Sequence, residues 1–189
     1  MSTSNKERKA KMNALITDLK SGEEKKILKA LKGLQVNGDD EAILPILEVW
    51  NDGVSEKAAA EIITFLSDIK STTTVDPIME VLLDNNFKKI HHALLTTIWN
   101  SKVDYSEYLV DFVTLATQYD FMITLECLTI IENLDGPFQE HHFLDAEIIL
   151  REFAEKVQHK REDFDERKVK LVSEIGNTLK GMEHQNVDF

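Results

Sequence analysis

Residues 43–66 read ILPILEVWNDGVSEKAAAEIITFL, and this stretch decides the fold that the sequence predicts. It contains two amphipathic helical patterns, separated by a break at Asn51-Asp52-Gly53. In the first pattern the apolar residues follow the i, i+3, i+4, i+7 spacing of one helix face. They are Ile43, Ile46, Leu47 and Trp50. The stretch therefore predicts two helices joined by a short turn.

Much of this pattern recurs 32 residues further along the chain. Pro45 is matched by Pro77, and the turn residue Asp52 is matched by Asp84. The apolar set of the first helix becomes Val75, Ile78, Met79 and Leu82. A helix pair that repeats at this period is typical of an α-solenoid.

The second helices of successive pairs align in three apolar columns at steps of 32, 32 and 33 residues. The columns are Ala30, Ile62, Leu94 and Cys127; Leu31, Ile63, Leu95 and Leu128; and Leu34, Leu66, Ile98 and Ile131. We expect these side chains to be buried between helix pairs. Cys127 is accordingly expected to be a small core residue and not a nucleophile.

The helix-breaking residues along the chain predict ten helices in one continuous domain, residues 1–189. Residues 5–137 are expected to form four helix pairs, and residues 138–181 a longer C-terminal pair that caps the array with a polar outer face. Residues 182–189 are expected to be a frayed tail. Asp39 or Asp40 can cap the helix that contains Pro45, and Ser55 can cap the helix after it.

The repeated stretch resembles a HEAT repeat, in which a proline lies early in the first helix and an aspartate lies at the turn. Pro45, Asp52 and the small residues Ala58-Ala59-Ala60 match, although the Val-Arg pair that usually follows the turn is absent. The resemblance covers about residues 5–158. It implies an all-α, right-handed α-solenoid (superhelix) of antiparallel pairs, of the armadillo type, that works as a protein-binding scaffold or adaptor.

The same resemblance implies that the second helices line a concave face to which partners bind. The candidate partner-binding residues are the polar positions of those helices: Glu61, Thr64, Asp68, His92, Thr96, Glu126, Thr129 and Glu132. The three threonines share one register, at steps of 32 and 33 residues. A plain solvated face is the alternative interpretation.

Charge is distributed unevenly along the chain. Residues 1–35 hold nine Lys or Arg and four Asp or Glu, whereas residues 39–147 hold five and 21, a net charge of −16. Such a body is expected to attract a basic protein partner, or simply to keep the chain soluble. It argues against nucleic acid, and so against a HEAT-like DNA glycosylase that acts on alkylated bases, because DNA requires a basic groove. Tethering to nucleic acid or to the ribosome through Lys6, Arg8, Lys9 and Lys11 is a further alternative.

The sequence contains no constellation that predicts an enzyme. Phosphate-binding glycine loops, H-E-x-x-H and G-x-S-x-G are all missing. His91 and His92 are adjacent, so on a helix they point about 100° apart. His141 and Asp145 could share an ion, but further ligands at suitable spacing are lacking. We expect a cytoplasmic, non-enzymatic protein with no cofactor, no metal and no membrane span; the sequence leaves the oligomeric state open.

Overall fold

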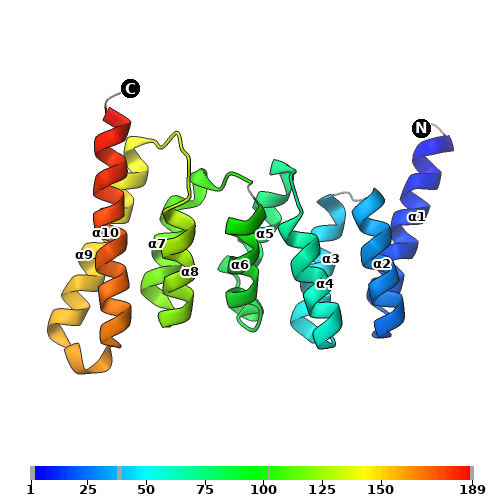
Figure 1. The fold of residues 1–189 in the computed structure, drawn as a ribbon, viewed down its shortest axis with the longest axis horizontal. Coiled ribbons are helices and arrows are strands. Elements are labelled where there is room, and N and C mark those ends of the chain that lie inside the picture. Colours follow the sequence, from blue (N-terminus) through cyan, green and yellow to red (C-terminus); the bar gives the residue numbers. More distant parts are fainter. Residues whose placement is uncertain (1–2, 38–39, 102, 188–189) are drawn as a thin grey trace. The chain divides into compact units, whose positions relative to one another are not determined.

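The computed structural model describes residues 3–37, 40–101 and 103–187, and the described chain is all-helical, with ten α-helices, short 3₁₀ turns and no strand. Contacts divide the chain into two compact units, Met1–Val103 and Asp104–Phe189. Each unit buries its own apolar core. Figure 1 shows the order of the helices along the chain.

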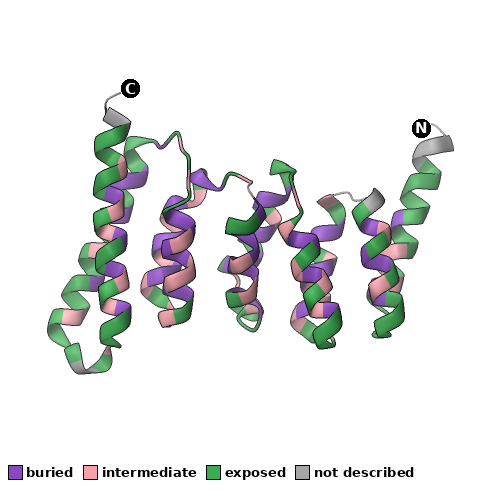
Figure 2. Ribbon diagram, in the orientation of Figure 1, coloured by how far each residue is buried: buried purple, intermediate pink, exposed green. Residues whose placement is uncertain are grey.

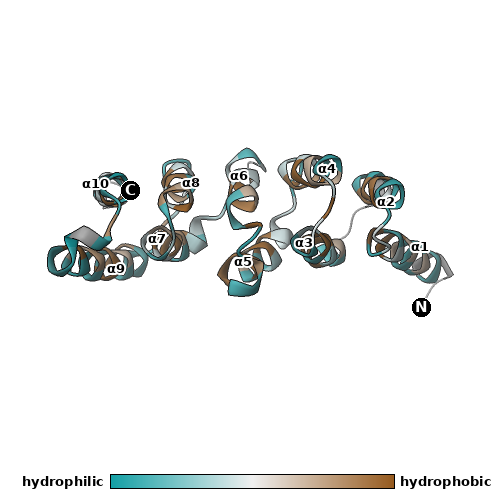
Figure 3. Cartoon of the chain, turned by 90° about the horizontal axis from the view of Figure 1, so that it is seen from below, coloured by the Kyte–Doolittle hydropathy of each residue, from teal (hydrophilic) through white to brown (hydrophobic). Residues whose placement is uncertain are grey.

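The first unit is a set of antiparallel helix pairs arranged in two layers. Its helices are α1 (Thr3–Leu19), α2 (Glu24–Asn37), α3 (Ile43–Asp52), α4 (Glu56–Ser67), α5 (Val75–Leu83) and α6 (His91–Ser101). Helix α4 packs against α2 and α6, and α3 packs against α1 and α5. Figure 3 shows these two layers, with the apolar sides of the helices facing one another.

The second unit has the same two-layered organisation with longer helices at its end. Its helices are α7 (Leu109–Gln118), α8 (Phe121–Ile131), α9 (Glu140–His159) and α10 (Glu166–Val187). Helix α9 packs beside α7, and α10 packs beside α8. His142, near the start of α9, is buried, and its Nε2 lies 3.9 Å from the carboxylate of Glu107, in the 3₁₀ turn that precedes α7.

The predicted apolar columns are buried at all but one position. Ala30, Ile62, Leu94 and Cys127 are fully buried, and so are Leu34, Leu66, Ile98 and Ile131. In the third column Leu31, Leu95 and Leu128 are buried, but Ile63 is only half-buried. The buried face of α4 consists of Ala58, Ile62, Phe65 and Leu66, and Ile63 falls outside it. Figure 2 shows buried residues on the inward sides of the helices of each unit.

The predicted N-cap is confirmed for α4 and is wrong for Asp40 at α3. Ser55 is the N-cap of α4, and its hydroxyl accepts a hydrogen bond from the Ala58 N–H at 3.3 Å. Asp40 does not cap α3, because a 3₁₀ turn, Asp40–Ala42, precedes that helix. Its carboxylate instead accepts a hydrogen bond from the Thr73 hydroxyl, which comes from the next helix pair. The alternative cap, Asp39, lies outside the described residues.

The C-terminal pair differs from its prediction at the end of the last helix. Helix α10 begins at Glu166, after a 3₁₀ turn at Arg161–Asp163, and it continues to Val187. Residues 182–187, which we predicted as a tail, are therefore helical; residues 188 and 189 lie outside the described part. The apolar stripe of α10 explains this, since Val172, Ile175 and Leu179 are buried against the unit and hold the helix in place.

Candidate partner-binding surfaces

The eight candidate residues from the sequence lie on α4, α6 and α8, and none of them is buried. Thr64, Asp68, His92 and Glu132 are exposed, and the remaining four, Glu61, Thr96, Glu126 and Thr129, are half-buried. Five belong to the first unit and three to the second. Within each unit they lie off the apolar columns, as a contact surface requires.

The three register-matched threonines use their hydroxyl donors within their own helices. Thr64 donates to the Ala60 carbonyl at 3.0 Å, and Thr129 donates to the Leu125 carbonyl at 3.0 Å. Thr96 donates to the Ala93 carbonyl at 2.7 Å. Each hydroxyl therefore offers a partner only its acceptor lone pairs. The threonine register is explained locally, and the carboxylates are the stronger candidates for recognition.

Two of the candidate carboxylates lie at the wrong ends of their helices for stability. Asp68 is the C-cap residue of α4, and Glu132 is the C-cap residue of α8. The helix dipole places partial negative charge there, so a carboxylate is disfavoured by about 0.3–1 kcal/mol. In the described part of the chain, neither carboxylate has a Lys, Arg or His within ion-pair distance. These two acids have no structural explanation.

The second unit carries most of the negative charge of the chain. Residues 104–155 hold twelve Asp or Glu and a single Lys or Arg, Arg151. Arg151 is itself held by Glu147, at 3.0 Å on the same helix. Asp111 is half-buried on α7, and burial raises the pKa of its carboxyl above the ordinary value. This stretch therefore forms a strongly acidic surface.

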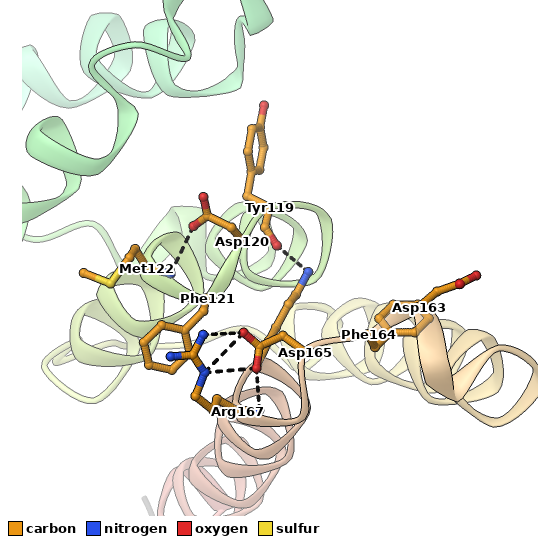
Figure 4. Close-up of a pocket in the computed structure, with 9 residues that line it drawn as sticks. Tyr119, Asp120, Phe121, Met122, Asp163, Phe164, Asp165 and Arg167 are labelled. Atoms are coloured by element: carbon orange, nitrogen blue, oxygen red, sulfur yellow. Dashed lines mark hydrogen bonds and ion pairs between the residues drawn. The ribbon is translucent and has the colours of Figure 1, made fainter.

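A cavity of about 620 Å³ opens where the turn between α7 and α8 meets the start of α10. Figure 4 shows the residues that line it, among them Tyr119, Phe121, Asp165 and Arg167. The Arg167 guanidinium lies 4.6 Å from the centre of the Phe121 ring and donates to Asp165 at 2.7 Å. These hydrogen bonds lower the pKa of the Asp165 carboxyl to about 2.

Lys168 occupies the wall of the same cavity and is buried. Its ammonium donates to the Thr117 carbonyl at 2.9 Å and also to the Tyr119 carbonyl. Burial lowers the pKa of Lys168 from its ordinary value, partly offset by the nearby Asp120. The last carbonyls of a helix have no partner within it, and here a lysine from α10 supplies one. Both cations of this cavity, Arg167 and Lys168, therefore make contacts within the chain. The hydrogen bonds of Lys168 link α10 to the end of α7.

A second hollow, of about 700 Å³, runs between α9 and α10. Its floor is apolar and includes Leu150, Val157, Val169 and Val172. The charged side chains along it are mixed in sign: Glu147, Arg151, Lys180 and Glu183. The groove thus offers apolar contact but no preference for the charge of a ligand.

The side chains weighed for chemistry take separate positions. Cys127 is fully buried, and burial raises the pKa of its thiol. His91 is buried whereas His92 is exposed, as their adjacency predicted. His141 and Asp145 are both exposed on α9. Among the described residues, no three His, Cys, Asp or Glu side chains converge as a metal site would require. None of the described helices has the length and apolar content to cross a membrane.

Comparisons with protein-family models, with curated proteins and with solved structures find no match for this chain. The resemblance to HEAT repeats therefore depends on the residues quoted above and on no relative. Function has to be argued from the geometry and the charge of the two units.

Proposed function

We propose that the chain is a HEAT-like α-solenoid that serves as a non-enzymatic protein-binding scaffold or adaptor, with a basic protein as its partner. The architecture is supported by the two-layered packing within each unit. It is also supported by the register of buried residues, which recurs from α2 to α4, α6 and α8 at almost constant steps. Such arrays present long helical surfaces to partners.

The observation that carries the binding proposal is the pair of carboxylates at the C-caps of α4 and α8. Asp68 and Glu132 oppose the dipoles of their own helices, and no cation in the described residues neutralises either of them. Residues that lower stability without a structural benefit are typical of functional sites. In each unit a basic partner segment would compensate the charge.

The electrostatics also determine how such a partner would bind. Exposed charges are screened beyond roughly 8 Å at physiological salt. A net charge of −16 over residues 39–147 therefore acts mainly on the encounter, and it should accelerate association more than it slows dissociation. The half-buried Glu61 and Glu126 add to the negative charge of α4 and of α8.

The experiment is affinity capture from native lysate with a four-site variant: Glu61→Gln, Asp68→Asn, Glu126→Gln and Glu132→Gln. We expect the wild type to capture one or more basic proteins, identified by mass spectrometry, and the variant to lose them. The variant should be at least as thermally stable as the wild type, because two dipole-opposing charges are removed.

A matched control removes four exposed acids elsewhere: Glu41→Gln, Glu80→Gln, Glu140→Gln and Glu174→Gln. It changes the net charge by the same amount, so it should retain the partners if the α4 and α8 carboxylates bind them. If both variants lost their partners equally, overall charge and not the α4 and α8 carboxylates would explain the capture. Capture that is unchanged in the four-site variant would contradict the proposal.

A further inference from the structure

Helix α9 presents two large aliphatic side chains to solvent on its outer side. Leu144 is 51% exposed and Ile148 is 52% exposed, and they lie one turn apart on the same helix face. A single exposed leucine is ordinary on a protein surface. Two neighbours that are both half-exposed are unexpected on a C-terminal pair, whose outer face should be polar.

The rim of this apolar pair is mostly acidic, although the exposed Lys156 lines the same hollow as two of its glutamates. Asp145, Glu152 and Glu155 are exposed around it, and His141 lies one turn before Leu144. No cation of the described chain lies within ion-pair distance of these three carboxylates. We call the set His141, Leu144, Asp145, Ile148, Glu152 and Glu155 the α9 stripe.

The α9 stripe lies on a helix that the rest of the unit holds firmly. Phe143, Ala146 and Phe153 are buried on the opposite side of α9, and Phe153 packs edge-on against Phe164 with ring centres 5.5 Å apart. The start of the helix is fixed by the His142 ring, which accepts the Gln139 N–H at 3.3 Å. The backbone that carries the stripe is therefore held by the core of the unit, which lowers the entropy cost of binding.

We propose that the α9 stripe docks a basic amphipathic helix of a partner protein. Two apolar side chains one turn apart on the partner would cover Leu144 and Ile148, and flanking lysines or arginines would meet the three carboxylates. The acidic rim opposes anionic lipid surfaces and nucleic acid, so a protein segment is the occupant that the charges favour. The inference rests on the proposed function in one respect, the basic character of the partner.

The experiment measures binding of two labelled peptides to the full chain by fluorescence anisotropy. One is a leucine–lysine peptide of about five helical turns with its leucines on one face, and the other is an isomer of the same composition with its leucines spread around the helix. The amphipathic peptide should bind the wild type more tightly than the isomer. The double variant Leu144→Ser and Ile148→Ser should weaken the amphipathic peptide by about tenfold or more, because half-exposed aliphatic area is no longer covered.

The matched control is Leu44→Ser with Leu83→Ser, which removes two leucines that are 41% and 45% exposed in the first unit. It should change the affinity of neither peptide. The acid variant Asp145→Asn, Glu152→Gln and Glu155→Gln should weaken both peptides. Circular dichroism should show unchanged helix content in all variants, since every substituted side chain is solvent-exposed.

The proposal for the α9 stripe would be wrong if the two peptides bound the wild type equally well. It would also be wrong if the Leu144→Ser, Ile148→Ser variant bound the amphipathic peptide as tightly as the wild type does. These results leave the capture experiment untouched, because its four acids lie on α4 and α8. Failure of the stripe can thus be distinguished from failure of the proposed function.

Discussion

The buried lysine of α10 gives the sharpest test of the packing within the second unit. Lys168→Met keeps an unbranched side chain of similar length in the same place but removes the ammonium. Two carbonyls at the end of α7, those of Thr117 and Tyr119, would then lose their donor. Those carbonyls lie beyond the reach of any intrahelical N–H, so the loss cannot be made good within α7.

The magnitude follows from opposing contributions. A hydrogen bond from a charged donor contributes about 1.5–3 kcal/mol, and Lys168 makes two. Burial of the ammonium opposes this, as the lowered pKa of Lys168 indicates, and methionine would relieve that cost. We expect a net loss of about 2 kcal/mol in the free energy of unfolding, with the two lost hydrogen bonds as its main source.

The aromatic residues of the chain allow the loss to be located. Both tryptophans, Trp50 and Trp99, are in the first unit, and all three tyrosines are in the second. Urea unfolding is followed by tryptophan fluorescence and by circular dichroism in the tyrosine region. The Lys168→Met midpoint should fall in the tyrosine signal, with Lys170→Met, which changes an exposed neighbour, as the control. A loss below about 0.5 kcal/mol would refute the reasoning, because it is smaller than one ordinary hydrogen bond.

Three further predictions concern the cores. Leu95→Ala should lower the free energy of unfolding by about 2–5 kcal/mol, because Leu95 is fully buried on α6. Ile63→Ala should lower it much less, and equal losses in urea unfolding would contradict the register. Deletion of residues 160–189 removes α10 and should lower the melting temperature or cause aggregation, and an unchanged monomer in light scattering would contradict the packing of α10 on α8. Burial lowers the pKa of His91 below its ordinary 6.5, so the unfolded chain alone takes up a proton below that pH. The free energy of unfolding should therefore fall as pH is lowered through 6.5, and less so in His91→Gln than in His92→Gln.

Periodicity in the sequence was sufficient to locate the helices and most of the core. Spacings of three and four residues mark one helix face whatever its neighbours are, so the burial of Leu34, Leu66 and Ile98 followed from the pattern alone. The end of α3 could be placed from the break at Asn51-Asp52-Gly53, and the start of α4 from Ser55. The cap expected from Asp40 failed because a 3₁₀ turn, Asp40–Ala42, precedes α3 and makes Ala42 the residue before the helix. The Asp40 carboxylate instead accepts a hydrogen bond from Thr73, a contact between residues far apart in the sequence.

The features that bear most on function depended on exceptions to the pattern. Lys168 lies four residues before Val172 and seven before Ile175, so it falls in the apolar register of α10. Because lysine is charged, its burial was not predicted from this spacing. Leu144 and Ile148 lie off the buried stripe of Phe143, Ala146 and Phe153, and that mismatch is visible in the sequence. Only the structure shows that both aliphatic side chains remain uncovered in the unit.

The measurement that tests the central claim most directly is the salt dependence of the association rate between the captured partner and the full chain. We expect the rate to fall steeply as salt is raised, and we expect the variant Glu61→Gln, Asp68→Asn, Glu126→Gln, Glu132→Gln to show a slower rate at low salt and a flatter dependence. Dissociation should change less than association. A partner that is itself acidic, or a rate that is insensitive both to salt and to these four substitutions, would contradict the claim that the carboxylates of α4, in the first unit, and of α8, in the second, recruit a basic protein.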